Sequence, residues 1–203
     1  MRNRWYEKFR KSHNLIWTEK DFRGWSNMVG QEIDVFRANI CGGGRVLDCG
    51  CGFGGTAVPL SNRGFRVVGI DVEEKILECA MENGRKFGRD VTFAKCDVYD
   101  IVKRFGPDSF DACISGGVME HFPEKDIRML LNLQLKVAPT VIFSVPLGEE
   151  NMTKTDDYGI LINLWTREKW LRKVKSYNVK ESRIVKSHRK VGIGQELFVV
   201  IKR

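Results

Sequence analysis

The residues with the clearest chemical potential are glycines that directly follow an apolar run. Residues 45–55 read RVLDCGCGFGG. Such a segment is typical of a buried strand that turns into a helix, because glycine accepts a sharp turn and lets a ligand approach the peptide N–H groups. Gly50, Gly52 and Gly55 also fit the G-x-G-x-x-G spacing of dinucleotide-binding folds. The spacing alone leaves a nicotinamide-dependent dehydrogenase open.

Asp48 distinguishes between the kinds of ligand that such a turn binds. It stands two residues before the first glycine, at the end of the predicted strand. A carboxylate at this point would repel the pyrophosphate of a dinucleotide. It suits a ligand that carries a positively charged ammonium or sulfonium group.

Two further aspartates follow predicted strands. Asp71 ends the segment VVGIDV (67–72), and Asp97 lies in FAKCDV (93–98). Each acid has a simpler explanation, since Asp48 and Asp71 could cap the helices that follow and Asp97 could lie in a surface turn. Ligands of open α/β sheets bind outside the carboxyl ends of the strands. Three acids at the same sheet end therefore favour a binding site.

These segments together resemble the class I S-adenosylmethionine-dependent methyltransferases over about residues 44–203. VLDCGCGFG is similar to the first motif of that family, and the segments with Asp71 and Asp97 are similar to its second and third motifs. FDACISGGVMEH (110–121) is similar to the fourth motif. The resemblance implies that Asp71 binds both ribose hydroxyls, that Asp97 binds the adenine amino group, and that the Ser115–Gly116 backbone faces the methionine moiety.

The resemblance also implies the cofactor, S-adenosyl-L-methionine, and the product, S-adenosyl-L-homocysteine. We expect no metal site. The expected cofactor-binding residues are Asp48, Gly50, Cys51, Gly52, Gly54, Asp71, Val72, Asp97, Val98 and Ser115.

His121 follows the fourth motif and is the candidate catalytic residue. A histidine at this position could accept a proton from the methyl acceptor. It could equally be a packing residue or an adenine-side contact. Trp5 and Tyr6, in the N-terminal segment, could close over the cofactor, although aromatic side chains are more often part of a core.

The apolar pattern predicts an α/β fold with a Rossmann-like, doubly wound and mostly parallel seven-stranded sheet, helices on both faces and an antiparallel hairpin at the end. Helical spacing indicates helices over 73–87, 124–136 and 166–175. The expected strands are 45–49, 66–71, 91–96, 110–115, 139–145, 179–186 and 196–202.

We expect one domain, residues 1–203, with an N-terminal helical cap (1–40) and a Rossmann-like core (41–203). Residues 147–164 are polar and long for a connection, which is typical of a functional loop. We expect this loop and residues 1–25 to lie over the carboxyl end of the sheet and to cover the cofactor. The basic loop with Gly192 and Gly194 joins the last two strands.

Composition restricts the compartment and the partners. The basic N-terminus has no apolar stretch behind it and no apolar run is long enough to span a bilayer, so we expect a cytoplasmic protein. Six cysteines stand mostly in apolar stretches, which favours structural thiols over disulfides or a metal site.

Charge leaves the methyl acceptor open. Residues 165–203 carry 12 Lys and Arg against 3 Asp and Glu, which could favour RNA or an acidic partner. The fourth motif reads SGGVME at 115–120, without the proline and aromatic residue that hold a flipped base in enzymes acting on base amino groups. We therefore expect a small molecule or a protein side chain as acceptor, with an RNA methyltransferase or a non-catalytic cofactor-binding subunit as alternatives.

Overall fold

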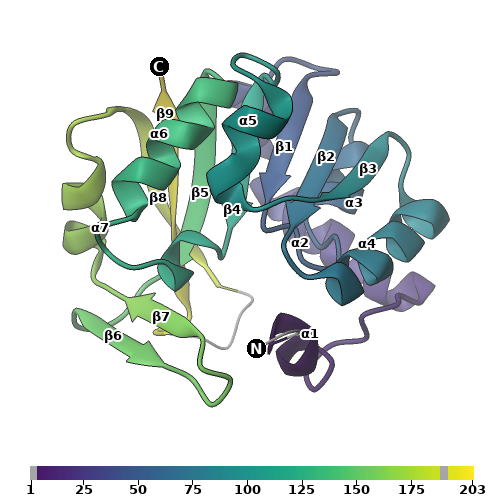
Figure 1. The fold of residues 1–203 in the computed structure, drawn as a ribbon, viewed down its shortest axis with the longest axis horizontal. Helices are drawn as coiled ribbons and strands as arrows, with labels where there is room; N and C mark the ends of the chain where they lie inside the picture. The colour runs from purple at the N-terminus through teal and green to yellow at the C-terminus, as the bar shows by residue number, and fades with distance from the viewer. Residues whose placement is uncertain (1–3, 188–191) are drawn as a thin grey trace.

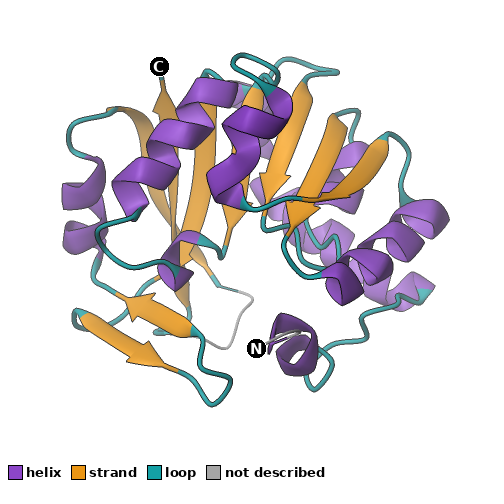
Figure 2. Ribbon diagram, viewed as in Figure 1, coloured by secondary structure: helices purple, strands orange, loops and turns teal. Residues whose placement is uncertain are grey.

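The computed structural model describes residues 4–187 and 192–203, and its centre is a seven-stranded sheet with helices on both faces (Figures 1 and 2). The strand order is β3-β2-β1-β4-β5-β9-β8. Strands β1 to β5 pair in parallel, and β9 runs antiparallel to both β5 and β8. The strands are β1 (Arg45–Cys49), β2 (Arg66–Asp71), β3 (Val91–Lys95), β4 (Ala112–Gly116), β5 (Thr140–Pro146), β8 (Asn178–Lys186) and β9 (Gln195–Lys202).

The helices complete a Rossmann-like α/β fold, as the sequence predicts. They are α1 (Arg4–Phe9), α2 (Glu19–Asn39), α3 (Ala57–Ser61), α4 (Glu74–Phe87), α5 (Ile101–Phe105), α6 (Ile127–Val137) and α7 (Arg167–Val174), with the 3-10 helices η1 (Val98–Asp100) and η2 (Met119–His121).

The core lies on both faces of the sheet, because successive strand residues point to opposite sides. In β1, Leu47 packs in a cluster with Leu130 of α6, whereas Val46 packs in a second cluster with Phe36 of α2. Strands buried on both faces read as continuous apolar runs, which is why β1 and β5 are recognisable in the sequence.

Two predicted boundaries are wrong at their N-terminal ends. The strand expected at 110–115 begins at Ala112, because Asp111 uses its carboxylate to accept a hydrogen bond from the Arg45 N–H at 2.6 Å. The helix expected at 124–136 begins at Ile127. Glu124 lies outside this helix and forms ion pairs with Lys169 and Lys173 of α7.

The polar segment 147–164 was expected to be a loop. It instead contains an antiparallel hairpin of β6 (Met152–Thr155) and β7 (Leu161–Leu164). Its turn forms where the Asp156 carboxylate accepts the backbone N–H groups of Tyr158 and Ile160, both at 2.9 Å. β6 is fully exposed, so it carries no apolar pattern that could reveal a strand. The prediction failed because polar edge strands resemble loops in sequence.

The N-terminal segment divides into two parts with different positions. α2 packs Val29 and Phe36 against one face of the sheet, and a capping box formed by Thr18 and Asp21 begins this helix. α1 lies beyond the carboxyl ends of the parallel strands, close to the β6–β7 hairpin (Figure 1).

The cysteines are free thiols, and all except Cys41 are buried. This agrees with the expectation of structural thiols. Across residues 4–187 and 192–203, no helix combines the length and the apolar character needed to cross a membrane. The basic loop between β8 and β9 lies partly outside the described residues, as do residues 1–3 of the N-terminal segment.

Candidate functional site

A cavity of about 1710 Å³ lies at the carboxyl ends of the parallel strands. Its walls include His121 and nine of the ten residues expected to bind the cofactor, namely Asp48, Gly50, Cys51, Gly52, Asp71, Val72, Asp97, Val98 and Ser115. Gly54 does not line the cavity. Its φ is +94°, and a Cβ there would lie 3.1 Å from a methyl group of Val58, so it serves the turn itself.

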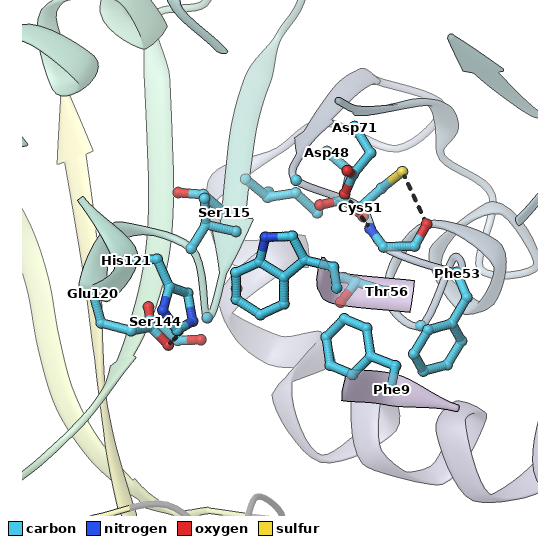
Figure 3. Close-up of a pocket in the computed structure, with 18 of the residues that line it drawn as sticks. Phe9, Asp48, Cys51, Phe53, Thr56, Asp71, Ser115, Glu120, His121 and Ser144 are labelled. Carbon is cyan, nitrogen blue, oxygen red and sulfur yellow. Dashed lines mark hydrogen bonds and ion pairs between the residues drawn. The ribbon is translucent and has the colours of Figure 1, made fainter. Parts of the chain in front are cut away.

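The cavity has two sides, which Figure 3 shows on either side of its centre. The aspartate side consists of Asp48, Asp71 and the glycine turn 50–55, at the ends of β1 and β2. The histidine side consists of Glu120, His121 and Ser144, from η2 and β5. The sequence motifs predicted the first side almost completely and the second only through His121.

The glycine turn is fixed by its backbone. Gly50 and Gly52 have φ values of +70° and +54°, which side-chain-bearing residues rarely adopt. A Cβ on Gly50 would also lie 2.8 Å from a methyl group of Val118. The N–H of Cys51 donates to the carbonyl of Ile70 at 2.9 Å, which ties the turn to β2. The turn is therefore shaped before any ligand arrives.

Asp48 is a buried acid whose pKa is raised. Only 3% of it is exposed, and its Oδ2 atom has no hydrogen-bond partner among the described residues. Burial, with a smaller contribution from the charge of Asp71, raises the pKa of Asp48 to about 7, although a hydrogen bond from the Ala57 backbone opposes the shift. A buried carboxylate with a free oxygen is complementary to a positively charged ligand group.

Asp71 connects the glycine turn to the start of α4. Its Oδ2 accepts the N–H of Gly52 and its Oδ1 accepts the N–H of Glu73, both at 3.1 Å. Burial raises the pKa of Asp71, while these backbone hydrogen bonds lower it. Glu73, and not Asp71, is the N-cap residue of α4. The helix-cap explanation therefore does not account for Asp71.

The remaining predicted residues differ widely in exposure. Val72 is 48% exposed, and Asp97 is exposed and accepts the N–H of Tyr99 at 3.0 Å as the cap of η1. Val98 is buried at the cavity wall. Ser115 is fully buried, and its hydroxyl has no hydrogen-bond partner within the described chain. Ser115 thus offers a polar group beside the cavity, between its two sides.

On the histidine side, His121 is held by two neighbouring segments. Its Nδ1 lies 2.7 Å from the carbonyl of Leu161 in β7, so Nδ1 carries the proton and Nε2 is free to accept one when the ring is neutral. Nε2 lies 3.7 Å from Oε1 of Glu120, which is 2% exposed. The ring of Trp5 contacts the imidazole edge to face, with centroids 4.6 Å apart.

α1 and the hairpin together form part of the cavity wall. Lys8 of α1 pairs with Asp156 of the hairpin turn at 2.8 Å, and Arg4 donates to the carbonyl of Gly159 at 2.6 Å. Trp5 lines the cavity, whereas Tyr6 is not among its lining residues. Glu73 and Ser144 were not predicted at this site, because no local spacing marks contacts across 40 or more residues. The segment 147–164 was expected over the carboxyl end of the sheet, but its hairpin and its contact with His121 were not predicted.

The mostly parallel sheet, the antiparallel β8–β9 pair at its edge and the acids at the strand ends define the class I methyltransferase fold. Residues 46–138 match the family described as methyltransferase domain. The resemblance to class I S-adenosylmethionine-dependent methyltransferases is thereby confirmed for this part of the chain.

Individual relatives agree with this assignment. The ubiquinone biosynthesis O-methyltransferase of Dechloromonas aromatica is 37% identical over 119 residues, 58% of this chain and 51% of that protein. An S-adenosyl-L-methionine-dependent Diels-Alderase of a Neonectria species is 32% identical over 111 residues, 50% of this chain and 45% of that protein. Relatives also include 23S rRNA (uracil(1939)-C(5))-methyltransferases. The chain spans about half the length of the first of these relatives.

The fold similarity extends over nearly the whole chain. A 1,6-didemethyltoxoflavin-N1-methyltransferase from Burkholderia thailandensis, with bound 1,6-didemethyltoxoflavin and S-adenosylhomocysteine, has a TM-score of 0.71. It is 19% identical, and the match covers 98% of this chain and 85% of that one.

Proposed function

We propose that the protein is an S-adenosylmethionine-dependent methyltransferase that acts on a small-molecule or protein side-chain nucleophile. The observation that carries the proposal is Asp48, buried at the end of β1 with an oxygen that lacks a hydrogen-bond partner in the described residues. In a dinucleotide-binding fold, the negatively charged pyrophosphate would lie at the position of this oxygen. It fits the ammonium or sulfonium group of S-adenosylmethionine, which carries no phosphate.

The other residues of the aspartate side fit the same cofactor. In this proposal Asp71 holds the ribose hydroxyls and Asp97 the adenine amino group, while Val72 and Val98 pack against the adenosine. The backbone at Ser115 and Gly116 faces the methionine moiety. The unpaired hydroxyl of Ser115 gives this part of the wall a polar group that can bind it.

The bound cofactor supplies a methyl group that is already activated by the positive charge on sulfur. The chain must then orient the acceptor in line with that methyl group and exclude water. These effects can lower the activation free energy by up to about 7–11 kcal/mol. Nε2 of His121 is the group that accepts the acceptor's proton, since its Nδ1 is committed to Leu161. Glu120, beside Nε2, stabilises the imidazolium that forms.

A small molecule or a protein side chain is favoured as acceptor over a nucleobase. Among the described residues, the cavity wall contains no Lys or Arg from 165–203. Several of these cations instead make contacts within the protein, as Lys169 does with Glu124 at 3.2 Å and with the ring of Trp165. The basic segment and the rRNA-methylating relatives keep RNA methylation as the second candidate. The cytoplasmic location stays a prediction.

The test of the cofactor assignment is a thermal shift. S-adenosylhomocysteine should raise Tm, since a ligand that binds only the folded state stabilises it by mass action, and NADH at equal concentration should not. Asp48→Asn should reduce the shift. An increase in Tm with NADH and none with S-adenosylhomocysteine would overturn the proposal.

A further inference from the structure

Glu73 makes an unusual contact with the first turn of α1. Its two carboxylate oxygens accept the backbone N–H groups of Trp5 and Tyr6, at 2.8 and 2.9 Å. These N–H groups lie in the first turn of α1, where the helix supplies no acceptor of its own. The Glu73 side chain, at the start of α4, therefore holds the first turn of α1. The two residues that it binds, Trp5 and Tyr6, are 68 and 67 positions away in the sequence.

The tether matters because α1 is short, with six residues, and buries no residue fully. Helices this short are unstable in isolation, so α1 depends on the contacts it makes with the rest of the chain. Besides Glu73, these include the polar contacts of Lys8 and Arg4 with the hairpin turn.

Glu73 is also joined directly to the aspartate side. Its own N–H donates to Oδ1 of Asp71, whose Oδ2 accepts from Gly52. Phe9, at the end of α1, reaches the same turn, since its ring lies 3.9 Å from the position a Cβ would take on Gly52. It also contacts the ring of Phe53 at a centroid distance of 5.5 Å. Both ends of α1 therefore touch elements of the aspartate side.

α1 reaches the histidine side as well. Trp5 stacks on Phe9 with centroids 5.5 Å apart and contacts His121 at 4.6 Å. A continuous row of rings thus leads from Phe53 at the glycine turn to His121. Within the described chain, α1 is joined to the sheet by no backbone pairing, so the row depends on its side-chain contacts.

We propose that Glu73 is a positioning residue that holds α1 as a strap across both sides of the cavity, and that a bound cofactor stabilises this docked strap. The proposal rests on the proposed function. A ligand on Asp71 fixes the turn that carries Glu73 and fills the space beneath Phe9, and both effects favour the docked strap. Trp5 then forms the wall of the acceptor site next to His121.

The experiment measures amide hydrogen exchange of residues 4–9 and acrylamide quenching of Trp5 fluorescence, with and without S-adenosylhomocysteine. The Trp5→Phe variant supplies the background of the other four tryptophans, because Trp17, Trp165 and Trp170 are buried but Trp25 is half-buried and also lines the cavity. In Glu73→Ala, exchange should accelerate by about tenfold or more, since two hydrogen bonds to a charged acceptor are lost. Glu73→Gln, which keeps one acceptor oxygen, should restore part of the protection and part of the shielding of Trp5.

Glu82→Ala is the matched control, because Glu82 lies on α4, which Glu73 caps, and its ion pairs in the described part of the chain are with Arg85 and Lys86. It should leave exchange at residues 4–9 and the shielding of Trp5 unchanged. In the native protein, S-adenosylhomocysteine should slow exchange over residues 4–9. Glu73→Ala should lose this effect while its affinity for S-adenosylhomocysteine falls by less than about threefold, about 0.65 kcal/mol.

Equal exchange at residues 4–9 in ligand-free native protein and Glu73→Ala would overturn the tether. If S-adenosylhomocysteine binds but leaves these amides unprotected in the native protein, the claim that the bound cofactor stabilises the docked strap is overturned. If S-adenosylhomocysteine does not bind at all, the proposed function fails instead, and the ligand-free comparison still decides whether Glu73 holds α1.

Discussion

The two sides of the cavity are built in different ways. The aspartate side comes from consecutive strand–turn–helix units, in which each acid ends a strand and the turn that follows is fixed by glycine. The histidine side comes from η2, β5, β7 and α1, which meet only in the folded chain. One side is thus rigid and local, and the other is assembled from distant segments.

This difference separates cofactor binding from acceptor selection. A preshaped turn, the buried Asp48 and the half-buried Asp71 can bind the same cofactor whatever the acceptor is. The hairpin and α1 carry exposed polar contacts that can change without disturbing the sheet. Substitutions on the aspartate side should therefore change cofactor affinity, and substitutions on the histidine side should change the reaction with the acceptor.

The largest loss of S-adenosylhomocysteine affinity is expected for Asp71→Ala. Two charge-assisted hydrogen bonds to the ribose are removed, each worth about 1.5–3 kcal/mol, so the affinity should fall by about a hundredfold or more. Titration calorimetry measures the loss, and circular dichroism checks that the fold persists. Unchanged affinity would show that Asp71 only orders Gly52 and Glu73.

A smaller effect, which depends on pH, is expected at Asp48. Because the pKa of Asp48 is about 7 in the free protein, a ligand ammonium must displace its proton at low pH. Affinity for S-adenosylhomocysteine should therefore be about tenfold weaker at pH 6 than at pH 8, the change expected for one displaced proton on a group with a pKa near 7. Asp48→Asn should bind weakly at both pH values. A native affinity that does not vary over this range would contradict the assigned role.

The stability of the ligand-free protein gives the control for Asp48. Its pKa is raised above the ordinary value of 3.8, so the folded state favours the protonated form. Folding stability should fall as pH rises from about 4 to 7, and the penalty should be complete above pH 7. Asp48→Asn should therefore raise Tm at pH 8 and leave it nearly unchanged at pH 4. An equal change in Tm at both pH values would mean that the charge of Asp48 is not the cause.

The smallest change in cofactor affinity is expected on the histidine side. His121→Phe keeps a ring against Trp5 but loses Nε2 and the contact of Nδ1 with Leu161. S-adenosylhomocysteine affinity should change by less than about threefold, whereas methyl transfer should slow by about a hundredfold if proton acceptance is removed. An affinity loss as large as that of Asp71→Ala would show that the two sides are not separate.

The same contrast explains what the sequence could predict. The parallel strands, Asp48 and Asp71 follow from apolar runs and the residues that end them, which are local signals, whereas Ser115 followed only from the resemblance to the fourth family motif. All four residues of β6 are exposed and three of them are polar, so only its pairing with β7 makes it a strand. The contact of His121 with Leu161 and that of Glu73 with α1 join residues 40 and 68 positions apart, and no spacing rule marks such pairs.

The most direct test of the central claim is the fate of a labelled methyl group. The protein is incubated with methyl-tritiated S-adenosylmethionine and a cell extract separated into small-molecule, protein and RNA fractions, with Asp71→Ala as the control. The account predicts label in a small molecule other than S-adenosylmethionine or in the protein fraction, and no such transfer with Asp71→Ala. Label that enters RNA at a comparable or higher rate, or no label in any fraction, would contradict it.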